Sequence, residues 1–181
     1  MAIYLETDRL IIREFNPADE QNLFDLDSDP AVVEFLTKRP STREEVLAAL
    51  ARIEKFRIKF QGRFGVWAVT ERSSGEFIGW FHFRPGKRDL ENIKRIELGY
   101  RFKKSAWGKG YAQEGSRALI KKGFEELGVE EVFALTMETN VRSRNVMEKC
   151  GLKYVRSFVD PDYGSKELEI GRASCRERVW R

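Results

Sequence analysis

The sequence predicts a single α/β domain built around a mixed β-sheet, and three observations lead to that prediction. The chain has 181 residues, of which 41% are hydrophobic and 34% charged, proportions typical of one globular domain. Strand-like segments joined by a turn signal lie in the middle of the chain, and helical and strand-like periods alternate after them. No repeat, low-complexity stretch or Gly/Pro/Ser-rich linker divides the chain. Consecutive hairpins followed by a strand–helix–strand crossover predict a mixed sheet with helices packed on it.

The first part of the chain is expected to contain one strand and two helices. Residues 9–15 are β-rich, and Asn16-Pro17 then places a capping side chain before a proline at the first helical position. The helix should run to about Leu26, because Asp29-Pro30 would end it. Residues 41–45, STREE, form a capping pattern for a second helix. Its apolar face would consist of Val46, Leu47, Leu50, Ile53 and either Phe56 or Ile58.

Three strands and a longer helix are expected next. Residues 64–70 and 77–84 are joined by the hairpin signal ERSSG, and residues 93–102 form the third strand. The period then becomes helical over residues 111–127, and Gly128 is placed to end that helix.

The remaining segments alternate between strand and helix. Residues 131–137 read as a strand, and residues 141–149 as a short helix that Gly151 closes. Residues 152–159 and 166–170 read as two further strands.

The formal net charge of +4 is concentrated in the last residues, 171–181. They contain four arginines and one glutamate, so they supply +3 and leave +1 for residues 1–170. The segment shows neither a strand nor a helix period and resembles translated vector sequence. We therefore assign the domain to residues 1–170 and treat 171–181 as an added tail, the alternative being a natural tail that binds an acidic partner. If this tail cuts the last strand short, an incomplete sheet edge would favour self-association.

The composition also bears on partners and location. A nearly neutral domain gives no reason to expect nucleic-acid binding. No apolar run reaches the roughly 18–20 residues of a membrane-spanning helix, and the N-terminus lacks the pattern of a secretory signal. Two cysteines make no disulfide framework, and the one histidine, His82, has no cluster of metal ligands in the sequence around it. We expect a cytoplasmic protein without a membrane segment or a metal.

The most informative segment is WGKGYAQE at residues 107–114, which follows a strand and opens a helix. Gly108 and Gly110 let backbone N–H groups approach an anion without a Cβ in the way, and the positive end of the helix favours a phosphate. Three lysines add positive charge nearby: Lys103, Lys104 and Lys109. The segment is neither a Walker A loop nor a dinucleotide fingerprint, because no Ser or Thr follows the lysine and Gln113 occupies the third glycine position. A bare GxG is also compatible with an ordinary helix-starting turn.

The combination of this turn with the strand IELGYRF at 96–102 and the segment NVRSRNVMEKCG at 140–151 is more specific. It resembles the GNAT superfamily of N-acetyltransferases, in particular the branch of the ribosomal-protein-alanine N-acetyltransferases. The resemblance extends from about Leu5 to Ile170. It implies a single-domain GNAT fold, with a mixed, mostly antiparallel sheet, a splayed central strand and helices on both faces. It also implies direct transfer of an acetyl group from acetyl-CoA to a primary amine.

The resemblance further implies where acetyl-CoA binds. The pantetheine arm would bond to the strand backbone at Leu98, Gly99 and Tyr100. Asn140 matches a position whose side chain contacts this arm, and Asn145 would support the same wall. Ser105 stands where the family motif has Gln or Arg, a minor departure because backbone amides bind most of the phosphate. The pyrophosphate would lie on the turn formed by Ala106, Trp107, Gly108, Lys109, Gly110 and Tyr111.

The catalytic residues follow from the same resemblance. Glu97 matches an acidic position that would take the proton of the amine, the alternative being a structural ion pair with Arg95 or Arg101. The backbone N–H of Leu98 would polarise the thioester carbonyl. Ser143 matches a serine that assists the departing thiolate, the alternative being a hydroxyl that caps the helix 141–149. Met147 replaces the tyrosine that serves as general acid in many members.

The acceptor and the assembly stay open. A protein N-terminus, a polyamine or amino acid, and an aminoglycoside-like compound are the candidate acceptors. Acidic side chains in residues 28–40 and 160–164 would attract such a cationic amine. The alternative function is a non-catalytic acyl-CoA-binding module, which Met147 favours and Glu97 and Ser143 oppose. Either a monomer or a homodimer is expected.

Overall fold

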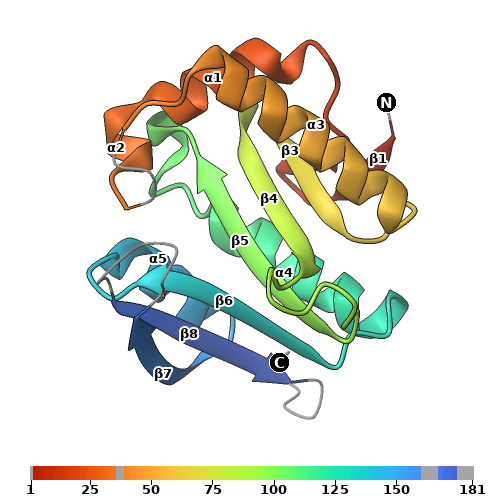
Figure 1. The fold of residues 1–181 in the computed structure, drawn as a ribbon, viewed down its shortest axis with the longest axis vertical. Helices are drawn as coiled ribbons and strands as arrows, with labels where there is room; N and C mark the ends of the chain where they lie inside the picture. Colours follow the sequence, from red (N-terminus) through yellow and green to blue (C-terminus); the bar gives the residue numbers. More distant parts are fainter. Residues whose placement is uncertain (1, 36–38, 160–166, 175–181) are drawn as a thin grey trace. The chain divides into compact units, whose positions relative to one another are not determined.

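A computed structural model describes residues 2–35, 39–159 and 167–174 and has an α/β fold (Figure 1). The chain divides into two compact units, the first made of residues 1–82 and 100–115 and the second of residues 83–99 and 116–181. Two strands and one helix each continue from one unit into the other, so the division does not fall in a linker. The assignment of one domain to residues 1–170 therefore stays a prediction.

The first unit contains three complete strands, three α-helices, one 3-10 turn and parts of three further elements. Strands β1, β2 and β3 pair in that order and are antiparallel. The elements are β1 (Ile3–Glu6), β2 (Leu10–Arg13), α1 (Asp19–Ser28), α2 (Pro30–Val33), α3 (Arg43–Lys59), β3 (Gly65–Glu71), the first part of β4 (Phe77–Pro85), the last part of β5 (Arg95–Phe102), the 3-10 turn Lys104–Ala106 and the start of α4 (Tyr111–Glu126). Strand β1 was missing from the sequence prediction, which placed a single strand at the start of the chain.

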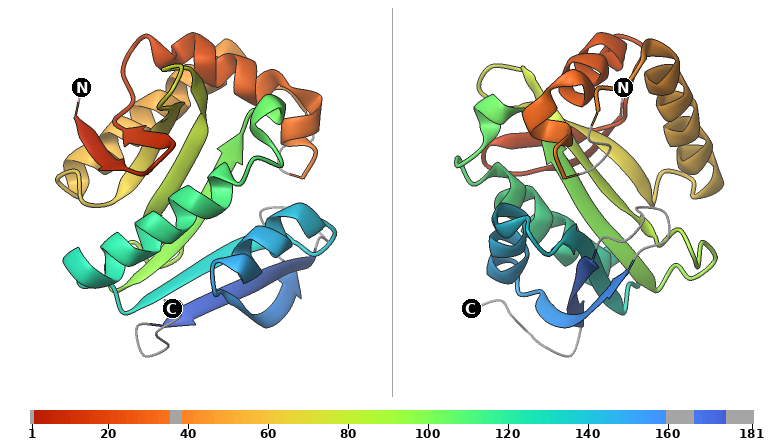
Figure 2. Two further views of the ribbon diagram at one scale, coloured as in Figure 1. Left: turned by 180° about the vertical axis from the view of Figure 1, so that it is seen from behind. Right: turned by 60° about the vertical axis from the view of Figure 1, so that its left-hand side comes forward.

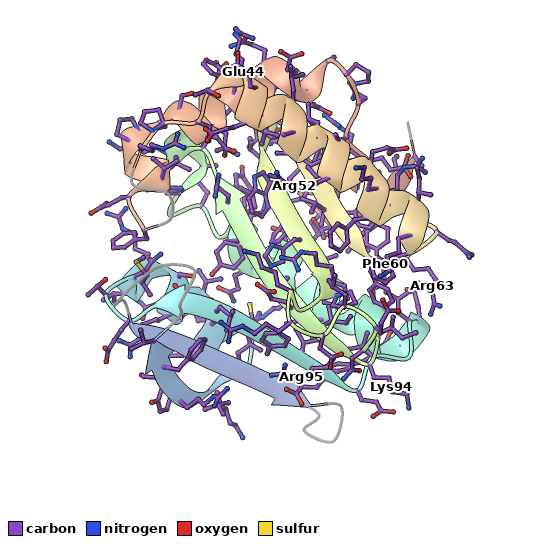
Figure 3. The ribbon with its side chains drawn as sticks, in the orientation of Figure 1. Glu44, Arg52, Phe60, Arg63, Lys94 and Arg95 are labelled. Atoms are coloured by element: carbon purple, nitrogen blue, oxygen red, sulfur yellow. The ribbon has the colours of Figure 1, made fainter. Side chains whose placement is uncertain are left out.

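The core of the first unit lies between its sheet and the helices α1, α2 and α3. Helix α3 packs along β3, as the two views of Figure 2 show. Near the end of α3 the ring of Phe60 meets that of Phe64 edge-on, with 6.0 Å between centroids (Figure 3). The buried cluster consists of Leu23, Leu26, Val32, Val46, Ala68 and Phe77. Burial of such side chains contributes on the order of 2 kcal/mol each, so this cluster is a main source of the unit's stability.

The capping predictions for the two long helices of this unit had different outcomes. At α3 the prediction is confirmed, because Thr42 and Glu45 form a reciprocal capping box. Its apolar face is narrower than predicted, since Leu47 and Ile58 are exposed. Helix α1 begins at Asp19 instead of Pro17, because the side chain of Asn16 accepts the N–H of Ala18 in a turn that precedes the helix.

Asp19 is the residue that ties α1 to the sheet. Its carboxylate is buried and accepts hydrogen bonds from both terminal nitrogens of Arg13 on β2, at 2.7 and 2.8 Å. The backbone N–H of Asn16 donates to the same carboxylate at 2.9 Å. The start of the helix is therefore held by a buried ion pair and not by the Asn16-Pro17 cap.

The second unit contains the rest of β4, β5 and α4, followed by β6 (Glu131–Met137), α5 (Val141–Lys149), β7 (Lys153–Val159) and β8 (Glu167–Ser174). Strands β5 and β6 are parallel, whereas β6–β8 and β7–β8 are antiparallel. The predicted mixed, mostly antiparallel sheet is confirmed. Among the described residues no helix is long and apolar enough to span a bilayer.

The position of β8 corrects the expectation for the end of the chain. The strand continues past residue 170 to Ser174, and it lies between β6 and β7 instead of at the sheet edge. Residues 171–174, assigned to the tail, therefore pair with β6. The argument for self-association through an incomplete last strand was wrong in its premise, since β7 ends the strand order.

Candidate active site

The predicted site residues are divided between the two units, and each set is described by itself. Tyr100 and the turn 106–111 belong to the first unit. The second unit holds Glu97, Leu98, Gly99, Asn140, Ser143 and Asn145.

The turn before α4 is the predicted phosphate site. Its backbone is anchored on one side by Trp107, whose indole N–H donates to the carbonyl of Phe102 at 2.9 Å. Gly108 and Gly110 have φ angles of 74° and 83°, in the left-handed region that favours glycine. Helix α4 begins at Tyr111, and the N–H of Glu114 donates to the carbonyl of Gly110 at 3.0 Å. The turn therefore leads directly into the positive end of the helix, where an anion is favoured.

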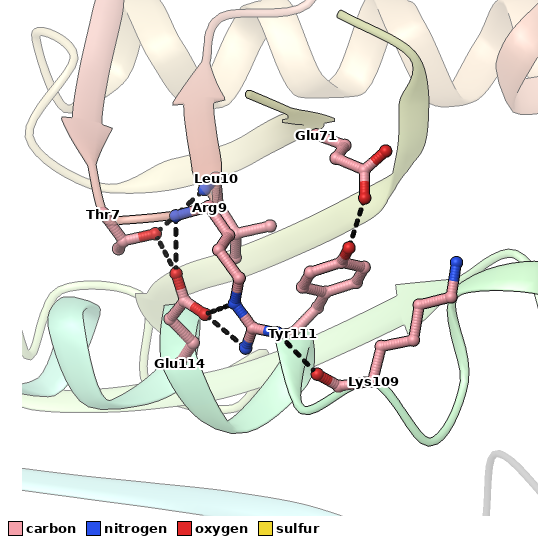
Figure 4. Close-up of polar contacts among 7 residues, drawn as sticks. All are labelled: Thr7, Arg9, Leu10, Glu71, Lys109, Tyr111 and Glu114. Carbon is pink, nitrogen blue, oxygen red and sulfur yellow. Dashed lines mark hydrogen bonds and ion pairs between the residues drawn. The ribbon is translucent and has the colours of Figure 1, made fainter. Parts of the chain in front are cut away.

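A second set of contacts, made by the side chains of Arg9 and Glu71, supports the turn. The sequence prediction did not include these contacts. The guanidinium of Arg9 binds the carboxylate of Glu114 and the carbonyl of Lys109 (Figure 4). The hydroxyl of Tyr111 donates to the carboxylate of Glu71 at the end of β3, which lowers the pKa of Glu71 and raises that of Tyr111. The sequence separation of Arg9 and Glu114 is 105 residues, so no local pattern could reveal the pair.

In the second unit, Glu97 lies where the parallel ladder between β5 and β6 ends. The paired residues are Arg95↔Glu131, Ile96↔Val132 and Glu97↔Phe133. At the start of this ladder Arg95 donates to Glu131 at 2.8 Å, and Lys94 donates to Glu130 at 2.6 Å (Figure 3). Leu98 and Gly99 follow the last pair of the ladder, and β5 continues beyond them. The end of the ladder is the feature expected of a strand that departs from its neighbour.

The carboxylate of Glu97 is only 12% exposed and lies 3.6 Å from Nη1 of Arg84. The sequence left open a structural pair with Arg95 or Arg101, and both of these partners are wrong. Arg95 pairs with Glu131, and Arg101 pairs with Asp27 of α1. Arg84 comes from β4, the neighbouring strand, and also donates to the carbonyl of Pro85 at 2.9 Å. Glu97 is thus a mostly buried carboxylate that lies beside the guanidinium of Arg84.

Leu98 and Tyr100 use their side chains for packing. Leu98 is buried, and the ring of Tyr100 lies 6.0 Å from that of Phe81 in the first unit. Their predicted contribution is through backbone groups, and such packing would hold those groups in place.

Helix α5 resolves one of the alternatives for Ser143. The cap of the helix is Asn140, whose Oδ1 accepts the N–H of Ser143 at 3.1 Å. Ser143 is half-buried in the first turn and does not occupy the capping position. Asn145 is exposed, and Met147, at the position of the missing tyrosine, is buried. The amide nitrogen of Asn140 remains a donor that the cap itself does not use.

Two further expectations concern metals and the acceptor. Within residues 2–35, 39–159 and 167–174, no group of three or more His, Cys, Asp or Glu side chains could hold a metal ion. Of the two acidic loops, residues 160–164 lie outside the described residues. Asp29, in the other loop, accepts the N–H of Ala31 and caps α2.

Comparison with known proteins agrees with the predicted fold and family. Residues 9–153 match the family described as the acetyltransferase (GNAT) domain. The chain is 34% identical over 183 residues to the FsC-acetyl coenzyme A-N(2)-transacetylase of Aspergillus fumigatus, covering 96% of this chain and 76% of that protein. It is also 28% identical over 150 residues to the uncharacterized N-acetyltransferase YoaA of Bacillus subtilis, covering 82% of each.

Solved structures share the fold at low sequence identity. A GNAT-family acetyltransferase from Bacillus anthracis superposes with a TM-score of 0.83 at 22% identity, over 98% of this chain and 100% of that chain. RimL, a ribosomal L7/L12 alpha-N-protein acetyltransferase in complex with coenzyme A, gives a TM-score of 0.81 at 14% identity, over 96% and 98% of the two chains.

The α/β fold of the chain, with its mixed sheet, is the fold that these acetyltransferases share. The chain belongs to the GNAT acetyltransferase family, and it is an acetyl-CoA-dependent acetyltransferase. The predicted superfamily is confirmed, and a ribosomal-protein N-acetyltransferase is among the structures that share its fold.

Proposed function

We propose that the protein transfers an acetyl group from acetyl-CoA directly to a primary amine, with Glu97 as the proton acceptor. The observation that carries this proposal is the position of Glu97, a mostly buried carboxylate at the last pair of the β5–β6 ladder. A relative with 34% identity is named as an N(2)-transacetylase, which supports an amine nitrogen as the acceptor. Small-molecule amines are the first class of acceptor to test. A protein N-terminus is the second class of acceptor.

Acetyl-CoA would be bound mainly by backbone groups. Beyond Glu97 the edge of β5 offers the backbone of Leu98, Gly99 and Tyr100 to the pantetheine arm. The pyrophosphate would lie on the turn 106–111. The N–H groups of Ala106 and Trp107 donate to the carbonyls of Lys103 and Lys104, so the N–H groups of Gly108 to Tyr111 would bind it, as the positive end of a long helix favours. Asn140 and Asn145 would line the pantetheine arm from α5.

The chemistry needs one proton acceptor and one proton donor. The amine nitrogen attacks the thioester carbon, a C–N bond forms and the C–S bond breaks, so the amine loses a proton and the CoA thiolate gains one. Glu97 would take the proton of the amine, directly or through water. The guanidinium of Arg84 lies 3.6 Å from this carboxylate and places a positive charge beside the group that would accept the proton. The N–H of Leu98 would stabilise the negative charge on the carbonyl oxygen, and Ser143 would donate to the thiolate.

The test combines binding and turnover. Isothermal titration of acetyl-CoA should show saturable binding to the wild type, and Gly110→Glu should abolish it by placing a side chain and a negative charge in the turn. A thiol-release assay with a panel of small amines and a peptide N-terminus would then identify the acceptor. Glu97→Gln should lower kcat by about 10²–10⁴-fold, the usual contribution of a general base.

The matched control for Glu97→Gln is Glu131→Gln. It removes the same charge from a strand residue that pairs with Arg95, and it should leave kcat nearly unchanged. Glu97→Gln retains the length of the side chain and an oxygen that can accept from Arg84, so acetyl-CoA affinity and the melting temperature should stay close to those of the wild type. A Glu97→Gln enzyme with wild-type kcat would exclude Glu97 as the base, and a folded wild type that binds no acetyl-CoA would refute the whole proposal.

A further inference from the structure

We propose that Arg9 is a positioning residue for the phosphate-binding turn. It holds the peptide between Lys109 and Gly110 so that the N–H of Gly110 is directed away from Arg9 and toward the pyrophosphate. The inference rests on the proposed binding of acetyl-CoA at this turn, and it adds a residue whose side chain need not touch the ligand.

The side chain of Arg9 joins the β1–β2 connection to the turn and to α4 (Figure 4). Its Nη1 donates to the carbonyl oxygen of Lys109 at 2.9 Å. Its Nε donates to Oε2 of Glu114 at 2.7 Å, and Nη2 lies 2.6 Å from the same oxygen. The other carboxylate oxygen of Glu114 accepts the backbone N–H of Arg9 at 3.0 Å and the hydroxyl of Thr7 at 2.6 Å. The guanidinium is thus held by the carboxylate of Glu114 and by the carbonyl of Lys109.

The orientation of one peptide group follows from the bond to Lys109. In a trans peptide the C=O and the N–H point in opposite directions, and none of the described peptide bonds is cis. Because the carbonyl of Lys109 points at Arg9, the N–H of Gly110 points away from it. A Cβ added to Gly110 would lie 3.4 Å from Nη2 of Arg9, so the guanidinium packs closely under the turn. Arg9 therefore determines which side of this peptide faces the anion.

The aromatic ring of Tyr111 restricts the guanidinium further. The Cζ atom of Arg9 lies 4.8 Å from the centroid of this ring, and the ring is held at its far end by Glu71. A planar fork can bind a carboxylate and a carbonyl at the same time, whereas a lysine ammonium is a single point of charge on a flexible stem. The geometry is therefore specific to arginine and would not be reproduced by lysine.

Orientation, and not positive charge, is the effect we assign to Arg9. Burial by itself would raise the pKa of Glu114, but the hydrogen bonds from Thr7 and Arg9 outweigh it and lower that pKa. Glu114 is therefore ionised near neutral pH and offsets the charge of Arg9. A pair with little net charge contributes little long-range attraction for a phosphate, so the role of Arg9 is exerted through the backbone it holds.

The experiment compares Arg9→Ala and Arg9→Lys with the wild type by calorimetric titration of acetyl-CoA and by steady-state kinetics. A hydrogen bond to a charged group contributes about 1.5–3 kcal/mol, which corresponds to a roughly 10–150-fold change in a dissociation constant. We expect Kd and KM for acetyl-CoA to rise by about that factor in Arg9→Ala, while kcat at saturating acetyl-CoA and KM for the amine stay unchanged. Arg9→Lys should be nearly as weak as Arg9→Ala.

The control is Lys121→Ala, which removes one positive charge from an exposed position on α4, the helix that carries Glu114. It should leave Kd, KM and kcat unchanged. If Arg9→Lys binds acetyl-CoA as tightly as the wild type, charge and not orientation is responsible, and the inference is overturned. Equal Kd values for wild type and Arg9→Ala would also overturn it. A parallel fall in kcat and in affinity for both substrates would show that Arg9 supports the fold in general and not this peptide, and would also overturn the inference. Failure of the wild type to bind acetyl-CoA would instead refute the proposed function.

Discussion

Gly115 brings the start of α4 unusually close to β4, and replacing it with alanine sets two opposing effects against each other. In the interior of an exposed helix this substitution stabilises by about 1 kcal/mol, because alanine has the better helix propensity. Here an added Cβ would lie 2.4 and 2.5 Å from two ring atoms of Phe81. Carbon atoms pack at about 3.5–4.0 Å, so the ring would have to move by about 1 Å in a core where overpacking costs about 1–3 kcal/mol.

We expect the overpacking effect to exceed the propensity effect, so that Gly115→Ala lowers the free energy of unfolding by about 1–2 kcal/mol. Urea unfolding followed by circular dichroism would measure the change. Phe81→Leu removes the clashing ring atoms, so the double variant should lose less stability than the sum of the two single losses. Gly123→Ala, whose added Cβ would lie 2.7 Å from the ring of Phe83, should be milder. A Gly115→Ala protein that is as stable as the wild type or more so would refute this account of the packing.

Two further predictions concern buried ionisable groups. Asp19→Ala leaves the Arg13 guanidinium buried without its partner and should lower the free energy of unfolding by about 3–5 kcal/mol, measured in urea at neutral pH. Burial raises the pKa of Asp19, but hydrogen bonds from Arg13 and Asn16 outweigh it and keep the folded-state pKa below 3.8. The stabilisation by Asp19 is therefore complete above that value and is lost as pH falls through the folded-state pKa. The free energy of unfolding of the wild type should then fall more between pH 6 and pH 3 than that of Asp19→Ala. An equal fall in the two proteins would contradict this prediction. Burial raises the pKa of the Cys150 thiol to about 11, so iodoacetamide at pH 8 should modify Cys150 only after unfolding. Mass spectrometry would locate the label. Modification of Cys150 at the same rate in the folded and the unfolded protein would exclude such burial.

Local signals in the sequence predicted the secondary structure well where a cap or a period was present. The strand 131–137 and the helix 141–149 have the predicted bounds, and α3 has its predicted capping box. The N-terminal hairpin was missed in part, because the four residues of β1 are too few for a period to be recognised. Strand β1 is an element whose structure depends on a neighbour in space, the strand β2 with which it pairs.

The candidate site shows the same limit. The glycine turn and the position of Glu97 follow from motifs, since each motif lies within a few consecutive residues. The partners of these residues, Arg84 beside Glu97 and Arg9 beside Glu114, come from other strands. A sequence pattern contains no information about register between distant segments. The alternative role of Glu97, a structural ion pair, could therefore be assigned only to the arginines nearest in sequence, Arg95 and Arg101, and not to Arg84.

The place of β8 between β6 and β7 has a consequence for the way the protein is made. On the ribosome β6 and β7 are synthesised first, and neither can complete its pairing until β8 has followed them out. For that interval β6 presents a row of unsatisfied N–H and C=O groups, which is the kind of edge that other nascent chains can join. The second unit is therefore the part of this enzyme most exposed to misassembly during translation, and any change that slows the emergence of residues 167–174 should be felt as a lower yield of soluble protein.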